Sequence, residues 1–468
     1  MTYQSDDTIC ALATAAGGAM ATIRISGVQA VNITDALFAS PTGHRLADCR
    51  SHTLHYGSII DDKDQVIDDV VVTLFRAPRS YTGEDTAEIS CHGSRYIISL
   101  ILQQLIRHGC RQAGPGEFTQ RAFLNGKMDL SQAEAVADLI ASSNATTHKM
   151  ALSQLRGNFS HQLIELRDQL LHLTTLLELE LDFSDHEDLE FSDRTELLQL
   201  TQRIDAHIQK LADSFQKGNA IKQGIPVAII GKTNVGKSTL LNRLLHDDKA
   251  IVSDIHGTTR DVIEDTINIG GVTFRFIDTA GIRNTNDAIE QLGIERTYQK
   301  LDEAAIVLWL TDTLPTEEEA ENILKRTEGK KLIAVVNKID LHAGTTFQPF
   351  SPISSSRSDA VEDIPVVEIS AKHNLHLDAL EDAIYKAADI PSITQNDVVV
   401  TSLRHFEALT KAHDDILRVE EGLQVGISGD LLSEDLRACI DHLAEIVGGT
   451  ITPGETLENI FSHFCVGK

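Results

Sequence analysis

The spacing of hydrophobic and polar residues changes three times along the chain, which predicts segments of different architecture. Up to about residue 120, apolar runs at 69–75 and 87–90 predict strands, and residues 96–108 predict a helix that ends at Gly109. From about residue 131 to 217, apolar positions recur every three to four residues, which predicts long helices. The chain therefore begins with an α+β segment and continues with a helical one.

Within the helical segment, a capping-box sequence from Ser131 to Glu134 predicts the start of a helix. A later stripe of leucines predicts one buried helix face: Leu163, Leu166, Leu170, Leu173 and Leu177. Residues 178–193 contain eight acidic residues and no Lys or Arg. Two interpretations of this acidic stretch stay open, a solvated bend between helices and a site for a divalent cation or a partner.

Beyond residue 218, short apolar runs alternate with helical segments, as in a parallel α/β sheet. These runs lie at residues 226–230, 274–277, 305–310, 332–336 and 366–369. The pattern is helical again over 403–419 and 431–446. Two helices are too few to form a core alone, so we expect them to pack on the helices of 121–217. The expected domains are then 1–120, a discontinuous helical domain (121–217 and 389–468), and an inserted α/β domain (218–388).

Composition narrows the class of protein. The 468 residues include 42% hydrophobic and 24% charged residues, as in ordinary globular domains. No apolar run approaches the roughly 18 residues that span a bilayer, so we expect no membrane segment. The six cysteines are scattered and form no C-x-x-C pair, which favours reduced cytoplasmic thiols over a disulfide scaffold or a zinc site. The 19 histidines likewise show no metal-ligand spacing. The net charge of −28 argues against a broad basic nucleic-acid face.

Residues 231–238 read GKTNVGKS and satisfy the phosphate-loop motif G-x-x-x-x-G-K-[ST] between a predicted strand and a predicted helix. In such a loop, backbone N–H groups and the helix N-terminus surround phosphate, Lys237 neutralises the β/γ charge and the Ser238 hydroxyl binds Mg²⁺. The residues expected to contact nucleotide here are Gly231, Asn234, Val235, Gly236, Lys237, Ser238 and Thr239.

Three downstream motifs follow predicted strands in the order that a GTPase requires. They are Asp278-Thr279-Ala280-Gly281, the residues Asn337, Lys338 and Asp340, and Ser370-Ala371-Lys372. Asp340 can accept hydrogen bonds from the ring N–H and the amino group of guanine, whereas adenine offers no such pair of donors. The motif set therefore predicts GTP rather than ATP.

Two details bear on catalysis. Ile282 occupies the position where many small GTPases have a water-positioning Gln, so hydrolysis must use another group, with Arg260 and Arg283 near in sequence. Asn234 has two interpretations, a simple loop-forming residue or a ligand for a monovalent cation that supplies positive charge beside the phosphates.

Several exact sequences have no obvious structural need. They are RISG (24–27), YTGED (81–85), HG (92–93), PGEFT (115–119), RAFLNGKMDL (121–130), QAEA (132–135), GTTRD (257–261) and the terminal FCVGK (464–468). Together with the inserted α/β domain, they resemble the MnmE (TrmE) family of tRNA-modification GTPases over essentially the whole chain.

The resemblance implies a K⁺-dependent GTPase that is activated when two GTPase domains meet. It assigns K⁺ to Asn234, Ser253, Ile255 and Thr258, and Mg²⁺ to Ser238 and Thr259. It makes Glu290 the catalytic residue that acts on the attacking water, where Glu290 would otherwise be read as a surface residue. The loop expected to close on GTP comprises Ser253, Asp254, Ile255, His256, Gly257, Thr258 and Thr259.

The resemblance also implies that residues 1–120 form a tetrahydrofolate-binding and dimerisation domain. Arg24, Glu84, Lys127 and Lys468 match positions that contact 5-formyl- or 5,10-methylene-tetrahydrofolate. Without the resemblance, Arg24 and Glu84 would be read as surface ion-pair residues. Cys465 is either a functional thiol or a small residue packed beside the folate site.

The implied function is a cytoplasmic homodimer that acts with a flavin-dependent (FAD) MnmG-type partner. Together they would add a carboxymethylaminomethyl or aminomethyl group to the wobble uridine of certain tRNAs. Two alternatives stay open, a ribosome-assembly GTPase switch and a folate-dependent aminomethyltransferase with a regulatory GTPase. An assembly GTPase usually carries a basic RNA-binding module, which this acidic chain lacks.

Overall fold

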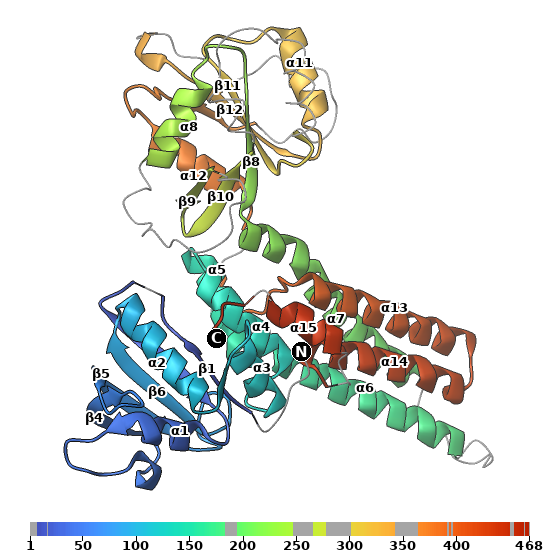
Figure 1. The fold of residues 1–468 in the computed structure, drawn as a ribbon. Coiled ribbons are helices and arrows are strands. Elements are labelled where there is room, and N and C mark those ends of the chain that lie inside the picture. Colours follow the sequence, from blue (N-terminus) through green and yellow to red (C-terminus); the bar gives the residue numbers. More distant parts are fainter. Residues whose placement is uncertain are drawn as a thin grey trace. The chain divides into compact units, whose positions relative to one another are not determined.

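A computed structural model describes residues 7–15, 17–182, 194–246, 265–277, 301–341, 364–390, 393–394, 396–449, 454–462 and 464–467. These residues form two compact units. One draws on residues 1–141, 151–209 and 407–468, and the other on 142–150 and 210–406 (Figure 1). In the part of the chain that the structure describes, no helix is long and apolar enough to cross a membrane.

The first unit contains a seven-stranded sheet with the strand order β3-β4-β5-β6-β2-β1-β7. Its strands are β1 (Thr8–Leu12), β2 (Met20–Ser26), β3 (Phe38–Ala39), β4 (Thr53–Ile60), β5 (Val66–Phe75), β6 (Thr86–His92) and β7 (Cys110–Gln112). Alternation along β1 and β2 sends Cys10, Ile23 and Ile25 to the face covered by α1 (Ala30–Leu37) and α2 (Arg95–Arg107), whereas Ile9 and Ala11 face α3 (Glu117–Leu124). The strands expected at 69–75 and 87–90 and the helix expected at 96–108 are confirmed as β5, β6 and α2.

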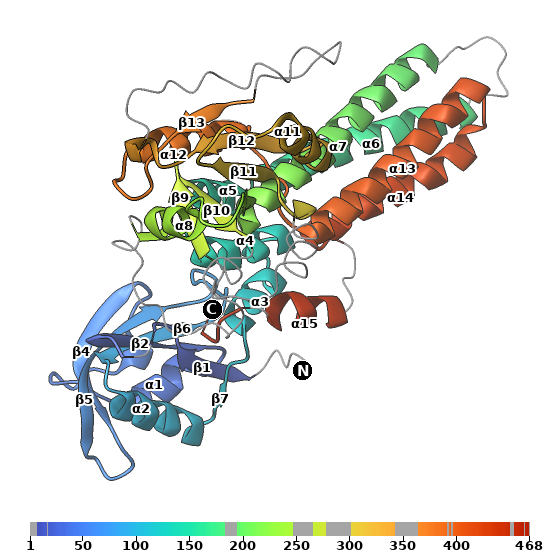
Figure 2. The ribbon, with the colours of Figure 1, turned by 90° about the horizontal axis from the view of Figure 1, so that it is seen from above.

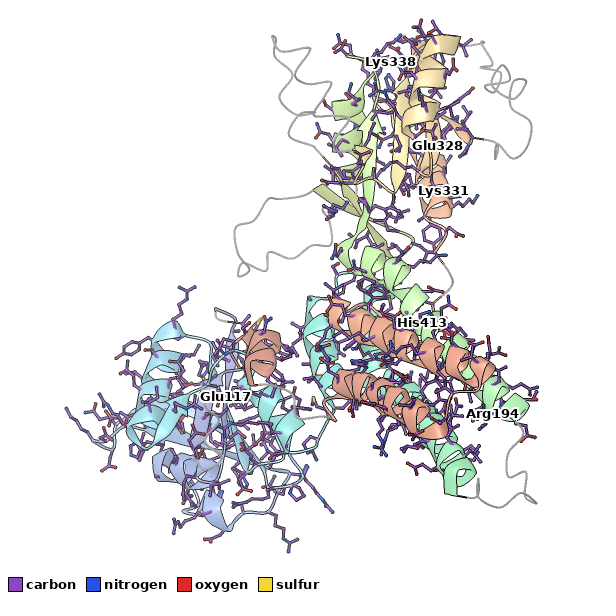
Figure 3. The ribbon with its side chains drawn as sticks, turned by 90° about the vertical axis from the view of Figure 1, so that its right-hand side faces the viewer. Glu117, Arg194, Glu328, Lys331, Lys338 and His413 are labelled. Carbon is purple, nitrogen blue, oxygen red and sulfur yellow. The ribbon has the colours of Figure 1, made fainter. Side chains whose placement is uncertain are left out.

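Long helices complete the first unit. They are α4 (Leu130–Ala141), α6 (Asn158–Asp182), the first part of α7 (Arg194–Gln223), α13 (Leu403–Val425), α14 (Gly429–Val447) and the short α15 (Gly454–Ser462). Helices α6, α7, α13 and α14 lie side by side in both views (Figures 1 and 2). All five leucines of the predicted stripe on α6 are buried. The packing expected between the two helical segments is confirmed, because α14 contacts α6 and His413 of α13, labelled in Figure 3, pairs with Asp205 of α7.

The capping box lies two residues earlier than the sequence predicts. Asp129 Oδ1 accepts from the Gln132 backbone N–H at 2.9 Å, and Gln132 Oε1 accepts from the Asp129 N–H at 3.0 Å. The predicted cap, Ser131, is instead buried and donates to Asp129 at 2.8 Å. The carboxylate is the stronger acceptor for the helix N-terminus, so Asp129 takes the position assigned to Ser131. Residues 183–193, most of the acidic stretch, lie outside the described residues.

The second unit contains a six-stranded sheet with the order β13-β12-β11-β8-β10-β9. Its strands are β8 (Ile225–Ile230), β9 (Asp265–Ile269), β10 (Val272–Phe276), β11 (Ile306–Thr311), β12 (Lys331–Val336) and β13 (Val366–Glu368). Ile225, Val227 and Ile229 face the core with α8 (Lys237–His246) and α12 (Leu377–Ala387), and Ala228 and Ile230 face the side of α11 (Glu317–Arg326). The five predicted strands are confirmed as β8, β10, β11, β12 and β13.

The sequence pattern did not predict two features of this unit, an antiparallel edge strand and a helix that begins within it. Edge strand β9 runs antiparallel to β10 through a turn at Gly270 and Gly271, where φ is +61° and +80°. Such mirror-image turns favour Gly-Gly, so this dipeptide was the usable signal. In addition, α5 (Ala145–Leu155) begins within the second unit, since Asn144 Nδ2 donates to Thr273 Oγ1 at 2.8 Å and the Thr146 N–H donates to the Gly271 carbonyl at 3.2 Å. The exact domain boundaries at 120, 217 and 388 stay predictions.

Candidate nucleotide and folate sites

The phosphate loop joins β8 to α8, which begins at Lys237. Asn234 and Gly236 adopt φ of +64° and +100°, and these values turn the backbone into the helix N-terminus. The ammonium group of Lys237 lies over the loop and donates to the carbonyls of Gly231 at 2.6 Å and Lys232 at 2.7 Å. Burial lowers the pKa of Lys237. Ser238 and Thr239 follow in the first turn of α8. The predicted phosphate-contacting residues therefore lie on the phosphate loop and on the first turn of the helix after it.

The predicted guanine-binding residues also come together. The backbone N–H of Ala371 donates to Asn337 Oδ1 at 3.0 Å, and Ser370 Oγ donates to Asp340 Oδ1 at 2.6 Å. The Ser370 hydrogen bond lowers the pKa of Asp340, which is therefore ionised at neutral pH. An ionised carboxylate held at the carboxyl ends of β12 and β13 can accept two hydrogen bonds from one guanine edge.

Two contacts hold the base-binding residues against the phosphate loop. Asn337 Nδ2 donates to the Val235 carbonyl at 2.8 Å, and Lys338 Nζ donates to the Asn234 carbonyl at 2.7 Å. Lys338 also forms an ion pair of 2.8 Å with Asp312, which follows β11. Figure 3 shows Lys338 at the end of the second unit. A Cβ added at Gly236 would lie 2.3 Å from Asn337 Nδ2, so only glycine permits this close approach. The sequence analysis did not identify Asp312.

Several predicted site residues lie outside the described residues. They are Ser253, Asp254, Ile255, His256, Gly257, Thr258, Thr259, Asp278, Thr279, Ala280, Gly281, Ile282, Glu290 and Lys468, together with Arg260 and Arg283. Of the residues expected at Mg²⁺ and K⁺, the structure therefore describes Ser238 and Asn234. The side chain of Asn234 is exposed on the loop.

Of the predicted folate residues, the structure describes Arg24, Glu84 and Lys127, which lie in or beside the loop at 77–85. Arg24 alternates with Ile23 and Ile25 on β2 and therefore faces away from α1 and α2. Arg24 donates from Nε to Glu88 at 2.8 Å, and its guanidinium lies 5.4 Å from the Tyr81 ring centre and 5.6 Å from that of Phe118. Lys127 Nζ donates to the Pro78 carbonyl at 2.9 Å, and its stem is adjacent to Gly83. Glu84 Oε2 accepts from Ser26 Oγ at 2.7 Å, and Ser26 lies two residues after Arg24 on β2.

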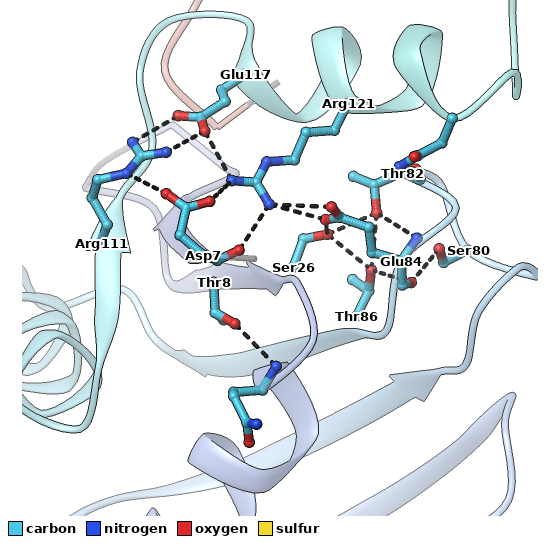
Figure 4. A network of polar contacts seen from close by, with 12 residues as sticks. Asp7, Thr8, Ser26, Ser80, Thr82, Glu84, Thr86, Arg111, Glu117 and Arg121 are labelled. Atoms are coloured by element: carbon cyan, nitrogen blue, oxygen red, sulfur yellow. Dashed lines mark hydrogen bonds and ion pairs between the residues drawn. The ribbon is translucent and has the colours of Figure 1, made fainter. Parts of the chain in front are cut away.

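A buried arginine, which sequence reasoning missed as a site residue, orders this region. Arg121 has no exposed side-chain surface and pairs with Asp7, with Glu84 at 3.2 Å and with Glu117 at 3.1 Å (Figure 4). Arg111 binds Asp7 and Glu117 from the other side (Figure 4). Burial opposes the ionisation of Glu117, but hydrogen bonds from Arg111, the Gly114 N–H and Arg121 outweigh it and lower its pKa. The only sequence signal was the i, i+4 spacing of Glu117 and Arg121.

The C-terminal segment docks beside the same region. Val466 forms a bridge with Pro115, and the Gly116 N–H donates to the Cys465 carbonyl at 3.4 Å. At Gly467, with φ of +97°, a Cβ would lie 2.2 Å from the Leu12 carbonyl oxygen. Phe461 and Phe464 pack with Leu130 and anchor the segment, whereas Cys465 itself is exposed. The structure therefore favours neither interpretation of Cys465.

The mostly parallel sheet, its phosphate loop and its guanine-type loops define the second unit as a P-loop GTPase domain, inserted between helical segments that follow an α+β domain. Residues 8–127 match the family model described as "GTP-binding protein TrmE N-terminus", and residues 130–465 match that of the "MnmE helical domain". The chain belongs to the MnmE (TrmE) family of tRNA modification GTPases. The expected family, fold class and enzyme class are thereby confirmed.

Relatives agree over nearly the full length. The tRNA modification GTPase MnmE of Bacteroides fragilis strain YCH46 is 57% identical over 470 residues, which cover 99% of this chain and 100% of the relative. The protein of the same name from Christiangramia forsetii is 47% identical over 474 residues, 99% of each chain. Among solved structures, a variant of Aquifex aeolicus Era bound to GDP.AlF4- is 28% identical over 41% of this chain and 66% of that chain, with a TM-score of 0.26.

Proposed function

We propose that this chain is a K⁺-dependent GTP hydrolase that acts in the cytoplasm as a homodimer, together with a flavin-dependent MnmG-type partner. The two proteins add a carboxymethylaminomethyl or aminomethyl group to C5 of the wobble uridine of certain tRNAs. Membership of the MnmE family over nearly the whole chain carries this proposal. The guanine-type loops and the polar face of the α+β domain support it.

In the nucleotide site, the Lys237 ammonium exchanges its two carbonyl partners for β- and γ-phosphate oxygens, which are stronger acceptors. Burial lowers the pKa of Lys237, and the negative charge of bound phosphate raises it again. Ser238 and Thr259 would hold Mg²⁺ by their hydroxyls, and the ion would neutralise charge on the phosphates. The position of Ser238 in the first turn of α8 fits this role, because its hydroxyl follows directly after Lys237.

Hydrolysis depends on residues of the proposed K⁺ site and on Glu290. The exposed side chain of Asn234, on the phosphate loop, fits a K⁺ ligand beside the phosphates, with Ser253, Ile255 and Thr258 as the further ligands. A K⁺ ion bound there would supply positive charge beside the phosphates, the role that an arginine finger has elsewhere. Glu290 orients the attacking water and so supplies what Ile282 cannot.

The folate proposal rests on the chemistry of the donors around the 77–85 loop. The terminal nitrogens of Arg24 make no hydrogen bond to a described residue, so they and Lys127 suit the glutamate tail. Glu84, held by Arg121 and Ser26, suits the N–H donors of the pterin. Lys468 would complete the set from the C-terminal segment. A bound methylene-tetrahydrofolate supplies the one-carbon unit.

Nucleoside analysis of tRNA from a deletion strain tests the proposal. We expect the modified wobble uridine to disappear on deletion, to return with the parental chain, and to stay absent with Lys237→Ala or Glu290→Ala. A Glu165→Gln variant, altered at an exposed position of α6, serves as the control and should restore it. Unchanged wobble nucleosides in the deletion strain would refute the proposal and favour a ribosome-assembly switch.

The role of Glu290 has its own measurement. Glu290→Ala should bind GTP with unchanged affinity but lose hydrolysis by about 10²-fold or more, the range expected when a group that acts on the attacking water is removed. Stopped-flow binding and single-turnover hydrolysis separate the two steps. A variant that hydrolyses GTP at the parental rate would contradict the assignment.

A further inference from the structure

Three side chains of metal-ligand type meet beside β4, on residues that neither the nucleotide proposal nor the folate proposal uses. His44 and Cys49 lie on the connection between β3 and β4, which contains a short 3-10 helix (Leu46–Asp48), and His55 lies on β4. One ligand atom from each lies within 4.8 Å of the other two. We call these three residues the His44–Cys49–His55 cluster. Their sequence pattern, H-x₄-C-x₅-H, passed unnoticed among 19 scattered histidines.

Two of the three separations are close to those around a tetrahedral ion, and the third, between His44 and Cys49, is at most 4.8 Å. His44 Nε2 lies 3.0 Å from His55 Nδ1, and Cys49 Sγ lies 3.9 Å from the same nitrogen. Bond lengths of about 2.0 Å to nitrogen and about 2.3 Å to sulfur place tetrahedral ligands about 3.3 Å apart for two nitrogens and about 3.5 Å apart for nitrogen and sulfur. Shifts of a few tenths of an ångström would bring both pairs to these values.

Hydrogen bonds around His55 determine its tautomer. The Thr53 hydroxyl donates its one proton to the Arg50 carbonyl at 2.6 Å, so it must accept from His55 Nε2–H, 2.7 Å away. His55 Nδ1 is therefore unprotonated, and its lone pair is directed toward His44 and Cys49. Burial and the neighbouring His44 lower the pKa of His55, which keeps this imidazole neutral. A neutral ring held by an outer hydrogen bond is the usual state of a metal-bound histidine.

His44 has the same two-sided arrangement. Its Nε2 faces His55, while its Nδ1 lies 2.7 Å from both Ser40 Oγ and Thr42 Oγ1. Hydroxyl groups can rotate to donate or accept, so they stabilise either tautomer of His44. When Nε2 gives up its proton, Nδ1 gains one and donates it to these hydroxyls, and the ring stays neutral.

Cys49 contributes the thiol of the cluster. Its thiol donates to the Arg45 carbonyl at 3.1 Å. Burial and the negative charges of Asp48 and Asp35 raise the pKa of Cys49, against the opposing effect of Arg76. The same negative charges attract a dication, which would displace the thiol proton as metals do at cysteine ligands.

We propose that His44 Nε2, His55 Nδ1 and Cys49 Sγ bind one Zn²⁺ ion, with a water molecule in the fourth position. Thiolate and imidazole together favour zinc over Mg²⁺ and Ca²⁺, which prefer oxygen ligands. Binding releases the thiol proton to solvent and involves no electron transfer. Since His44 is exposed, the fourth position faces water. The ion ties the connection at 40–52 to β4, next to the edge strand β3.

Cobalt titration of the full-length chain tests the site. After treatment with a chelator, and without nucleotide, Co²⁺ should give a sulfur-to-metal charge-transfer band and tetrahedral d–d bands that saturate at one equivalent and disappear when Zn²⁺ is added. Cys49→Ser should remove the charge-transfer band, and His55→Gln should remove the tetrahedral d–d bands. Cys465→Ser and His161→Gln, at exposed positions elsewhere, are matched controls that should keep both. No charge-transfer band, or one that survives Cys49→Ser, would refute the site.

A second measurement uses the unaltered chain and so does not depend on whether a variant folds. Iodoacetamide labelling followed by peptide mass spectrometry should show that Zn²⁺ slows alkylation of Cys49 by about tenfold or more, because a metal-bound thiolate is a poorer nucleophile. The exposed Cys465 should react at the same rate with and without Zn²⁺. Equal rates for Cys49 in both conditions would overturn the proposal.

Discussion

In the proposed function, base recognition depends on single residues, and we expect Asp340 to be the central one. Ser370 donates to one of its oxygens and holds the carboxylate at the carboxyl ends of β12 and β13. Asn337 does not share this role, because both ends of its amide bind protein, at Val235 and Ala371. We therefore expect Asn337 to hold the loops of the site together and Asp340 to bind the base.

Replacing Asp340 by Asn should change base specificity. The amide loses one acceptor for guanine and gains a donor that matches the second carbonyl oxygen of xanthine. We expect GTP affinity to fall on the order of 10²-fold, from weakened charge-assisted hydrogen bonds worth about 1.5–3 kcal/mol each, while XTP binding appears. Titration with labelled GTP and XTP measures both. Asp382→Asn, on the exposed side of α12, is the control, and unchanged GTP affinity in Asp340→Asn would contradict the role.

The buried cluster around Arg121 should make the first unit sensitive to acid. Hydrogen bonds and charge from Arg111 and Arg121 outweigh burial and lower the pKa values of Asp7 and Glu117. A carboxylate with a lowered folded-state pKa contributes stability above its unfolded pKa and loses it as the pH falls through the folded value. For Glu117 this loss begins below the ordinary value of 4.5. Urea unfolding at pH values from about 6 to about 3 should therefore show a falling midpoint.

The Glu117→Gln variant distinguishes the acid sensitivity of this cluster from that of the other carboxylates in the chain. The variant should be less stable at neutral pH and should lose less stability on acidification than the parental chain. Glu165→Gln, at an exposed position of α6, should follow the parental curve. Parallel curves for Glu117→Gln and the parental chain would show that the cluster does not contribute to acid sensitivity.

At the scale of elements, α6 shows how the spacing of leucines along the sequence determines which of their side chains are buried. Leu170 is fully buried against the neighbouring helices, while its neighbour Leu171 is 41% exposed. One residue of rotation, about 100° on a helix, accounts for the difference. The two leucines have the same helix propensity, so they form a matched pair for measuring burial alone.

Leu170→Ala should reduce the free energy of unfolding by about 2–5 kcal/mol, because it removes buried methyl groups and leaves a cavity. Leu171→Ala should cost less than about 1 kcal/mol. Denaturant unfolding followed by the helical circular-dichroism signal measures both. Equal losses in the two variants would mean that α6 does not pack in this register.

At the scale of the whole molecule, charge determines how a nucleic acid can be bound. The chain carries a net charge of −28, and residues 391–468 include 13 acidic residues but only five Lys and Arg residues. Few phosphate contacts are available on such a surface, so counterion release can contribute little to affinity. If tRNA is the substrate, as proposed, the partner must hold most of the phosphate backbone.

The chain alone should therefore bind tRNA weakly, with a dissociation constant of about 1 μM or above and a shallow dependence on salt. Adding the flavin-dependent partner should tighten binding by about tenfold or more and steepen the salt dependence. Fluorescence anisotropy with labelled tRNA at several salt concentrations measures this, with the partner alone as the control. Tight, strongly salt-dependent binding by this chain alone would contradict the shared role.

Local patterns in the sequence were sufficient for much of the fold and for the nucleotide loops. Strands β5 and β6 of the first sheet, five of the six strands of the second sheet, the buried stripe of α6 and the phosphate loop follow from spacing, since each depends on residues near one another in the chain. The same holds for Asp340, Lys338 and Asn337, which form one short motif after β12. The family resemblance supplied the proposed roles of Arg24, Glu84 and Lys127, which no local pattern indicates.

Only the tertiary structure decided which distant residues meet. Arg121 is placed between Asp7 and Glu84, 114 and 37 residues away, by the pairing of β1, β2 and β6 and the packing of α3. The antiparallel strand β9, the shift of the helix cap to Asp129 and the His44–Cys49–His55 cluster depend likewise on contacts or on competition between neighbouring acceptors. Periodicity describes which face of an element is buried, but the partner of that face is determined by the arrangement of the folded chain.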